Sequence, residues 1–342
     1  MIDPQLSDYP QALYIELTDR CNLSCPMCRS AGFKGDVLPF DMYLDIAKNL
    51  FPHAKFIDLR GWGESTLLKN FDDYLDVALS YKKRIKLITN GTVNRPSLWE
   101  KLGREGVLVG ISFDAADEVT FEHIRGGASM TRVLQNMEIL KDALLSNDHK
   151  VADNLYFCIT ASGDNIHQLR EIVKLGMQFG ITHFKMEPLK TTPEDPSNLI
   201  HHAQQVNHSI AQLTQLVKEH PYLKIEYSAS LLHENTNVQK VKKFCIHPFT
   251  YLYINSKGGL GFCDHLNGVA EFVWGQWQGE NGFRSFWQGE KMKRLREEHL
   301  LALNGGYISS CADCNWCYER RYADLEYLID ENWINYSEII TQ

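Results

Sequence analysis

The chain has 342 residues, 44% of them hydrophobic and 23% charged, which is typical of a globular protein with room for one large domain and a smaller one. Its net charge is −8 and no cluster of Lys and Arg is present, which argues against a nucleic-acid partner. The N-terminus lacks the pattern of a signal peptide and no apolar run approaches the roughly 18 residues of a membrane span, so we expect a cytoplasmic protein without membrane contact.

Residues 13–188 alternate short β-rich runs with amphipathic segments, the pattern of βαβ units and a parallel sheet. Six strands are predicted, at 13–17, 56–60, 85–89, 107–113, 155–160 and 183–187. Helices are predicted between them at 41–50, 72–81, 97–103, 132–145 and 166–179, the last ended by Gly180. Because ligands bind at the carboxyl ends of parallel strands, we expect the site on the loops that follow them.

The pattern changes after the sixth strand. A polar, proline-bearing stretch at 191–198 precedes a predicted long helix at 201–219. Beyond it, the periodicity is irregular and predicts a hairpin with strands at 250–255 and 260–263, joined by a turn that contains two glycines. The sequence therefore predicts an α/β unit at 1–195, a connecting helix region at 196–235, and a small unit at 236–342 with a hairpin, helices and a C-terminal helix.

Nine cysteines, an odd number gathered mostly in two groups, favour metal ligation in a reducing compartment over a disulfide framework. The first group, Cys21, Cys25 and Cys28, has the spacing C-x3-C-x2-C directly after the first predicted strand. Thiolates suit iron–sulfur clusters and zinc, and three ligands leave one iron of a cubane open. The alternative is a zinc site with a fourth ligand such as His53, but the polar loops after the other strands favour a cluster.

Residues 10–190 resemble the radical S-adenosylmethionine (SAM) superfamily, in which this cysteine triplet follows the first strand of a partial (β/α)6 barrel. The resemblance implies a [4Fe-4S] cluster whose open iron chelates the amino and carboxylate groups of SAM. It further implies that reductive cleavage of SAM gives a 5′-deoxyadenosyl radical that removes hydrogen from the substrate. A flavodoxin- or ferredoxin-type electron donor is expected. Met27 departs from the aromatic residue usual before the third cysteine, which leaves the adenine packing open.

The loops after the later strands carry residues to which the resemblance assigns SAM contacts. The sequence GWGES at 61–65 is similar to the family's Gly-Gly-Glu-Pro loop, whose backbone binds the methionine ammonium. Ser112 and Asp114, on and just after the fourth strand, are expected to face the ribose. Arg125 resembles the arginine that pairs with the SAM carboxylate. Each of these could also be structural. The expected cofactor-binding residues are Gly63, Glu64, Asn90, Ser112, Asp114, Arg125 and Glu187.

The second cysteine group comprises Cys263, with Gly258 five residues before it, Cys245, and a C-x2-C-x2-C run at 311–317. This pattern resembles the SPASM and twitch auxiliary domains of radical SAM enzymes, and the resemblance favours the shorter twitch type with one auxiliary cluster. The expected ligands of an auxiliary [4Fe-4S] cluster are Cys245, Cys263, Cys311 and either Cys314 or Cys317, with zinc as the alternative. His265, close to Cys263, is a candidate general base or a turn residue. Cys158 lies in an apolar strand, where a buried core thiol is expected.

The leading interpretation is a radical SAM oxidoreductase that oxidises or rearranges a small polar metabolite, such as a sugar, aminocyclitol or nucleoside, in a biosynthetic pathway. The first strand begins close to the N-terminus, so we expect no leader-binding domain before it. One alternative is modification of a ribosomal peptide, by epimerisation or crosslinking, with the spare thiol of Cys314 or Cys317 as hydrogen donor. Another is a metal-binding module without enzymatic activity.

Overall fold

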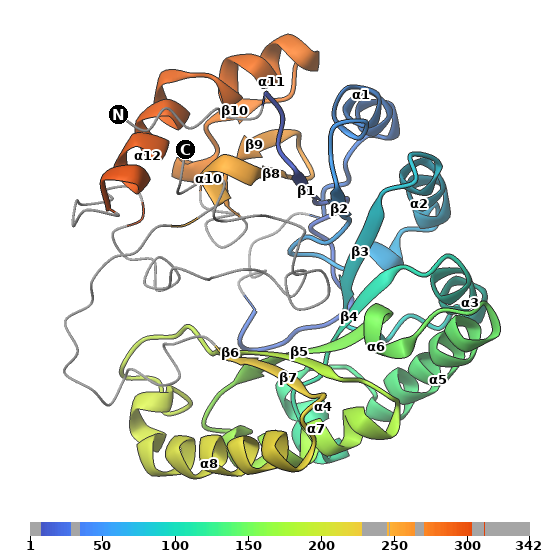
Figure 1. Ribbon diagram of the computed structural model, residues 1–342, viewed down its shortest axis with the longest axis vertical. Helices are drawn as coiled ribbons and strands as arrows, with labels where there is room; N and C mark the ends of the chain where they lie inside the picture. Colours follow the sequence, from blue (N-terminus) through green and yellow to red (C-terminus); the bar gives the residue numbers. More distant parts are fainter. Residues whose placement is uncertain are drawn as a thin grey trace.

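The computed structural model describes residues 8–28, 35–227, 245, 247–263, 270–302 and 311. Its strands form one curved sheet with helices on the outer face (Figure 1), in the order β10-β9-β8-β1-β2-β3-β4-β5-β6-β7. Strands β1 to β8 pair in parallel wherever they are neighbours. The strands are β1 (Ala12–Ile15), β2 (Phe56–Asp58), β3 (Arg84–Thr89), β4 (Leu108–Ser112), β5 (Leu155–Ala161), β6 (His183–Pro188), β7 (Lys224–Tyr227), β8 (Tyr251–Ile254), β9 (Gly259–Gly261) and β10 (Gly275–Gln276).

The helices bury one apolar side against this sheet and leave a polar side in solvent, as their sequence periodicity requires. Their ends are also encoded locally, since Asp117 and Ser129 cap the starts of α4 and α5, and Gly180 with φ +81° follows the end of α7. The helices are α1 (Phe40–Leu50), α2 (Phe71–Ser80), α3 (Pro96–Arg104), α4 (Glu118–Ile124), α5 (Met130–Ser146), α6 (Val151–Asn154), α7 (Leu169–Gln178), α8 (Ala203–Glu219), α10 (His247–Thr250), α11 (Gly279–Trp287) and α12 (Glu290–Ala302).

The predicted α/β fold is confirmed, including the six strands from β1 to β6. Helix α4 and strand β7 are among the elements that were not predicted. Helix α4 is short and buries only Phe121 and Ile124, too few positions to show a helical period. Strand β7 extends the sheet beyond β6 in parallel. None of the described helices is both long and apolar enough to span a membrane.

The predicted hairpin is present as β8 and β9, with Gly258 at φ +78° in its turn. Strand β8 also pairs in parallel with β1, from Ala12 opposite Tyr251 to Ile15 opposite Ile254. The hairpin is therefore continuous with the barrel sheet, and Figure 1 shows it next to the first strand. As a result, β1 is an inner strand with all four residues buried.

Candidate active site

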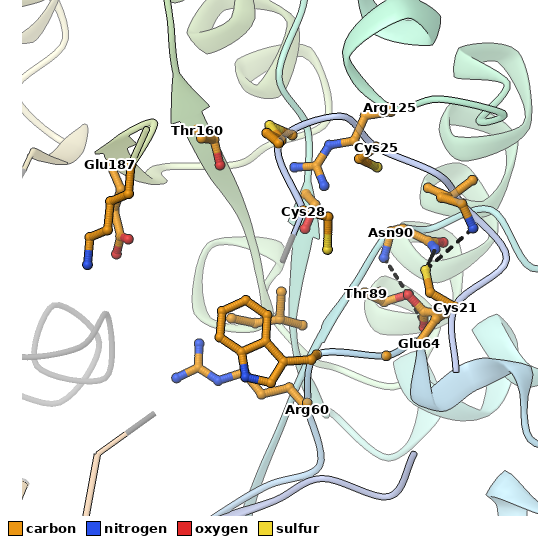
Figure 2. Close-up of a pocket in the computed structure, with 18 of the residues that line it drawn as sticks. Cys21, Cys25, Cys28, Arg60, Glu64, Thr89, Asn90, Arg125, Thr160 and Glu187 are labelled. Carbon is orange, nitrogen blue, oxygen red and sulfur yellow. Dashed lines mark hydrogen bonds between the residues drawn. The ribbon is translucent and has the colours of Figure 1, made fainter. Parts of the chain in front are cut away.

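A cavity of about 380 Å³ lies at the carboxyl ends of the strands, where the fold class predicts a ligand site. Cys21, Cys25 and Cys28 line one side of it (Figure 2), and Glu187 at the end of β6 lies across the cavity from them. Of the expected cofactor-binding residues, those that line the cavity are Gly63, Glu64, Asn90, Ser112, Arg125 and Glu187.

The loop that carries the cysteine triplet is held by hydrogen bonds that leave the thiols facing the cavity. Ser24 N donates to Gly126 O at 2.9 Å, and Cys28 N donates to Cys25 O at 3.0 Å. Two donors approach the sulfur of Cys21, Leu23 N at 3.5 Å and Asn90 Nδ2 at 3.8 Å. Donors of this kind stabilise a thiolate.

The thiols fit a cluster better than a single metal ion. Burial raises the pKa of Cys21 and of Cys25, so the thiolate forms need a nearby positive charge, which a bound metal supplies. In the described part of the chain, no three His, Cys, Asp or Glu side chains converge closely enough to hold one ion. His53, the suggested fourth zinc ligand, instead stacks on Tyr9 with ring centroids 3.7 Å apart, at the opposite end of the parallel strands.

The glycines after β2 are required by close packing against the cysteine loop. A Cβ atom on Gly63 would lie 2.5 Å from the carbonyl oxygens of Thr18 and Arg20. On Gly61 it would lie 2.3 Å from Cγ of Glu16. The backbone is also bonded across this contact, since Glu64 N donates to Arg20 O at 2.7 Å. The G-x-G spacing therefore allows the loop after β2 to approach the loop after β1.

The carboxylate of Glu64 is 3% exposed and fully engaged with protein groups. Its Oε1 accepts hydrogen bonds from Thr66 N at 3.2 Å, Thr66 Oγ1 at 2.5 Å and Thr89 Oγ1 at 2.8 Å, while Oε2 accepts from Asn90 N at 2.7 Å. Burial raises the pKa of Glu64, and these four hydrogen bonds oppose the rise. The side chain thus fixes the loops after β2 and β3, and its backbone remains the part that faces a ligand.

Asp114 and Arg125 form a buried ion pair beside the triplet. Asp114 is fully buried and does not line the cavity, whereas Ser112 does. Strand β4 ends at Ser112, so the strand alternation that would place Asp114 on the same side as Ser112 does not extend to it. Its Oδ1 accepts from Thr160 N at 2.7 Å. Burial raises the pKa of Asp114, and the guanidinium of Arg125 opposes the rise. Asp114 therefore orients Arg125, which lines the cavity next to Cys25.

On the side of the cavity away from the triplet, Glu187 was predicted from the sequence, whereas Arg60 and Lys185 were not. Arg60, after β2, pairs with Asp58 at 3.0 Å and lies over the Tyr14 ring, and Lys185 on β6 pairs with Glu187 at 3.0 Å. These residues stand at the ends of parallel strands, which is the signal that could have identified them. Other charged and aromatic residues that line the cavity are Trp62, Lys190 and Tyr253.

Cys158 is half-buried, which corrects the expectation of a buried core thiol. It lies on β5 opposite Ser112 of β4 and Lys185 of β6, two residues that line the cavity. Burial raises the pKa of Cys158 to about 11, and the positive charge of Lys185 opposes this rise. The thiol is therefore protonated at neutral pH.

Cys245, Cys263 and Cys311 of the second group are among the described residues, whereas Cys314, Cys317 and His265 lie outside them. Cys245 and Cys311 are buried, and Cys263 is half-buried just after β9. Soft thiol donors of this kind suit an iron–sulfur cluster.

His299 on α12 links the two buried cysteines of this group. Its Nδ1 accepts from Cys245 N at 3.1 Å, and its Nε2 lies 3.7 Å from Cys311 Sγ. Burial, with a contribution from His247, lowers the pKa of His299 to about 4, so the ring is neutral. With Nδ1 as acceptor, Nε2 carries the hydrogen and points at the sulfur. No motif marks His299 in the sequence, because its role depends on contacts across the fold.

Two family models match the chain, the radical SAM superfamily over residues 15–176 and an iron–sulfur cluster-binding domain, SPASM, over residues 245–315. AdoMet-dependent heme synthase of Methanosarcina barkeri is 23% identical over 97% of this chain and 98% of its own length. Mycofactocin maturase MftC of Mycolicibacterium smegmatis is 30% identical over 51% of this chain. The chain spans less than two thirds of several curated relatives, and 44% of MftC.

Among solved structures, anSMEcpe with bound AdoMet and Cp18Cys peptide has the same fold. The TM-score is 0.65 at 15% identity, and the match covers 90% of this chain and 86% of that one. The two family models imply a SAM-binding [4Fe-4S] cluster, SAM and an auxiliary cluster as the cofactors of this chain. With the triplet, the strand order and both models in agreement, the chain belongs to the radical SAM superfamily and is an enzyme that carries a SPASM-type iron–sulfur domain.

Proposed function

We propose that this radical SAM enzyme modifies a peptide. The observation that carries the proposal is the mixed lining of the cavity, where Arg60, Lys185 and Lys190 occur together with Glu187 and aromatic side chains. A peptide presents carbonyl and amide groups together with side chains of either charge, and such a mixed lining suits it. MftC, a maturase by name, and the fold neighbour that holds a peptide support the same reading.

The chain's own residues would hold and orient the reactants. The three cysteines would ligate the cluster, the backbone at 61–64 would bind the methionine end of SAM, and Arg125 would pair with its carboxylate. Asn90 and Ser112 would face the ribose and adenine. When bound, the cluster supplies the electron that cleaves SAM and so generates the radical that takes hydrogen from the peptide. We further propose a ferredoxin- or flavodoxin-type protein as the source of that electron.

A second candidate is modification of a tetrapyrrole. It is favoured by the match to AdoMet-dependent heme synthase, which extends over 97% of this chain, although at 23% identity. The sugar-type metabolite that the sequence favoured has less support, because neither relative above is named for such a substrate. Membership of the superfamily also sets aside the alternative of a metal-binding module without activity.

The test is an anaerobic assay of the reconstituted full chain with SAM and dithionite. Peptides encoded beside the gene and a haem-precursor porphyrin are supplied separately, and 5′-deoxyadenosine and substrate mass are measured. The proposal expects a peptide, and not the porphyrin, to raise 5′-deoxyadenosine formation and to change in mass. Cys25→Ala is the control and should abolish both signals. Turnover of the porphyrin with no change in any peptide would refute the proposal.

A further inference from the structure

We propose that Glu16 is a positioning residue that couples the β8–β9 hairpin to the SAM side of the cavity. The inference rests on the proposed SAM contacts of the loop at 61–64 and holds for any substrate. Glu16 directly follows β1, and its side chain is 3% exposed. A carboxylate at such a position is costly unless hydrogen-bond donors surround it.

Donors from two distant segments surround this carboxylate. Oε2 accepts from Trp62 N at 2.9 Å and from the hydroxyl of Tyr253 at 2.8 Å. Oε1 accepts from Ser256 N at 3.1 Å. Trp62 belongs to the loop after β2, whereas Tyr253 and Ser256 belong to β8 and the turn after it. One buried charge therefore holds the backbone of the proposed SAM loop and the hairpin together.

Both contacts lie directly behind the cavity wall. Trp62 and Tyr253 line the cavity, and Gly61 packs so closely on Glu16 that no Cβ atom would fit. On its other side, the hairpin ends at β9, two residues before Cys263. A shift of the hairpin would thus reach Trp62 through Glu16. Conversely, if SAM orders the loop at 61–64, it would favour one position of the β8–β9 hairpin relative to that loop.

Glu16→Gln is the direct test, in the full chain loaded with clusters. A glutamine retains one acceptor oxygen and directs an NH₂ group at a donor, so at least one of the three bonds is lost. We expect the dissociation constant for SAM, measured by equilibrium dialysis without substrate, to rise about tenfold while iron and sulfide content stay unchanged. Tyr253→Phe removes only the hydrogen bond from the Tyr253 hydroxyl to Glu16 and should raise the dissociation constant for SAM about threefold. This second variant keeps the proposal testable if Glu16→Gln fails to fold.

Asp45→Asn is the matched control. Asp45 on α1 accepts from Trp277 Nε1 at 2.9 Å, so it also joins the barrel to the C-terminal segment, but it does not contact the loop at 61–64. We expect this variant to lose thermal stability and to keep its SAM affinity. Unchanged SAM affinity in Tyr253→Phe, or equal weakening in Asp45→Asn, would overturn the proposal. Because no substrate is present, neither result depends on whether the substrate is a peptide.

Discussion

Replacing Glu64 with glutamine tests whether its buried carboxylate fixes the loops after β2 and β3. In the wild-type chain, Asn90 N donates a hydrogen bond of 2.7 Å to Oε2. The best orientation of the glutamine amide keeps the three hydrogen bonds at Oε1 and turns its NH₂ group toward Asn90 N. That change loses one hydrogen bond to a charged group and leaves two donors facing each other, for a net loss of about 3 kcal/mol. For a chain of 342 residues, such a loss lowers the melting temperature by about 4 °C.

The assay is thermal unfolding followed by circular dichroism at one scan rate, under anaerobic conditions. Glu138→Gln is the control, because Glu138 is a half-exposed residue on α5 that pairs with Lys141 at the surface, and its loss should change the melting temperature by no more than about 1 °C. If Glu64→Gln melts at the same temperature as Glu138→Gln, the inferred role of the four hydrogen bonds is wrong.

Four further predictions concern the residues around the cavity. In Gly63→Ala the new Cβ would lie 2.5 Å from two backbone oxygens, so the free energy of unfolding should fall by about 1–3 kcal/mol and less iron should be retained after reconstitution. Gly261→Ala, whose new Cβ would lie 3.3 Å from its nearest atom, is the control and should retain normal iron. Asp114→Asn should lower the free energy of unfolding in urea by about 3 kcal/mol, because it leaves the guanidinium of Arg125 without its buried partner, and a change below about 1 kcal/mol would contradict the ion pair. Cys158, with its pKa raised from 9.0 to about 11, should react with iodoacetamide about tenfold more slowly at pH 7.5 than a thiol of pKa 9.0, as measured by mass spectrometry, because a roughly 100-fold smaller thiolate fraction is partly offset by the greater nucleophilicity of the more basic thiolate. Since the folded protein retains this proton longer than the unfolded chain, Cys158 should lower stability as pH rises from 9.0 to about 11, and Cys158→Ser should reduce that slope.

Local sequence patterns predicted much of the fold. The alternation of strands and helices predicted β1 to β6 because each element has its own hydrophobic period and its own stop signal, such as Gly180. Pairing between distant segments leaves no such signal. The register of β8 on β1 was missed for that reason, since nothing near Tyr251 indicates that Ala12 is its partner.

The candidate site divides in the same way. The triplet and the glycine loop were found because they directly follow β1 and β2, and Arg125 was found through the family resemblance; all three line one cavity. Residues that act by orienting others were missed or misplaced. Asp114 was expected at the ribose but lies behind Arg125, and His299 became visible only through its contacts with two cysteines.

The position of β1 inside the sheet also bears on how the enzyme is assembled. Strand β1 is synthesised first, but one of its two neighbours, β8, emerges from the ribosome only after β7 has been made. Contacts between segments so far apart form slowly, and until they form one edge of β1 can pair with other chains. The cysteine triplet comes directly after β1 in the chain, so we expect cluster insertion to be most efficient after the hairpin has docked on β1. A chain truncated before residue 245 lacks β8, and we expect it to aggregate more readily because one edge of β1 stays unpaired.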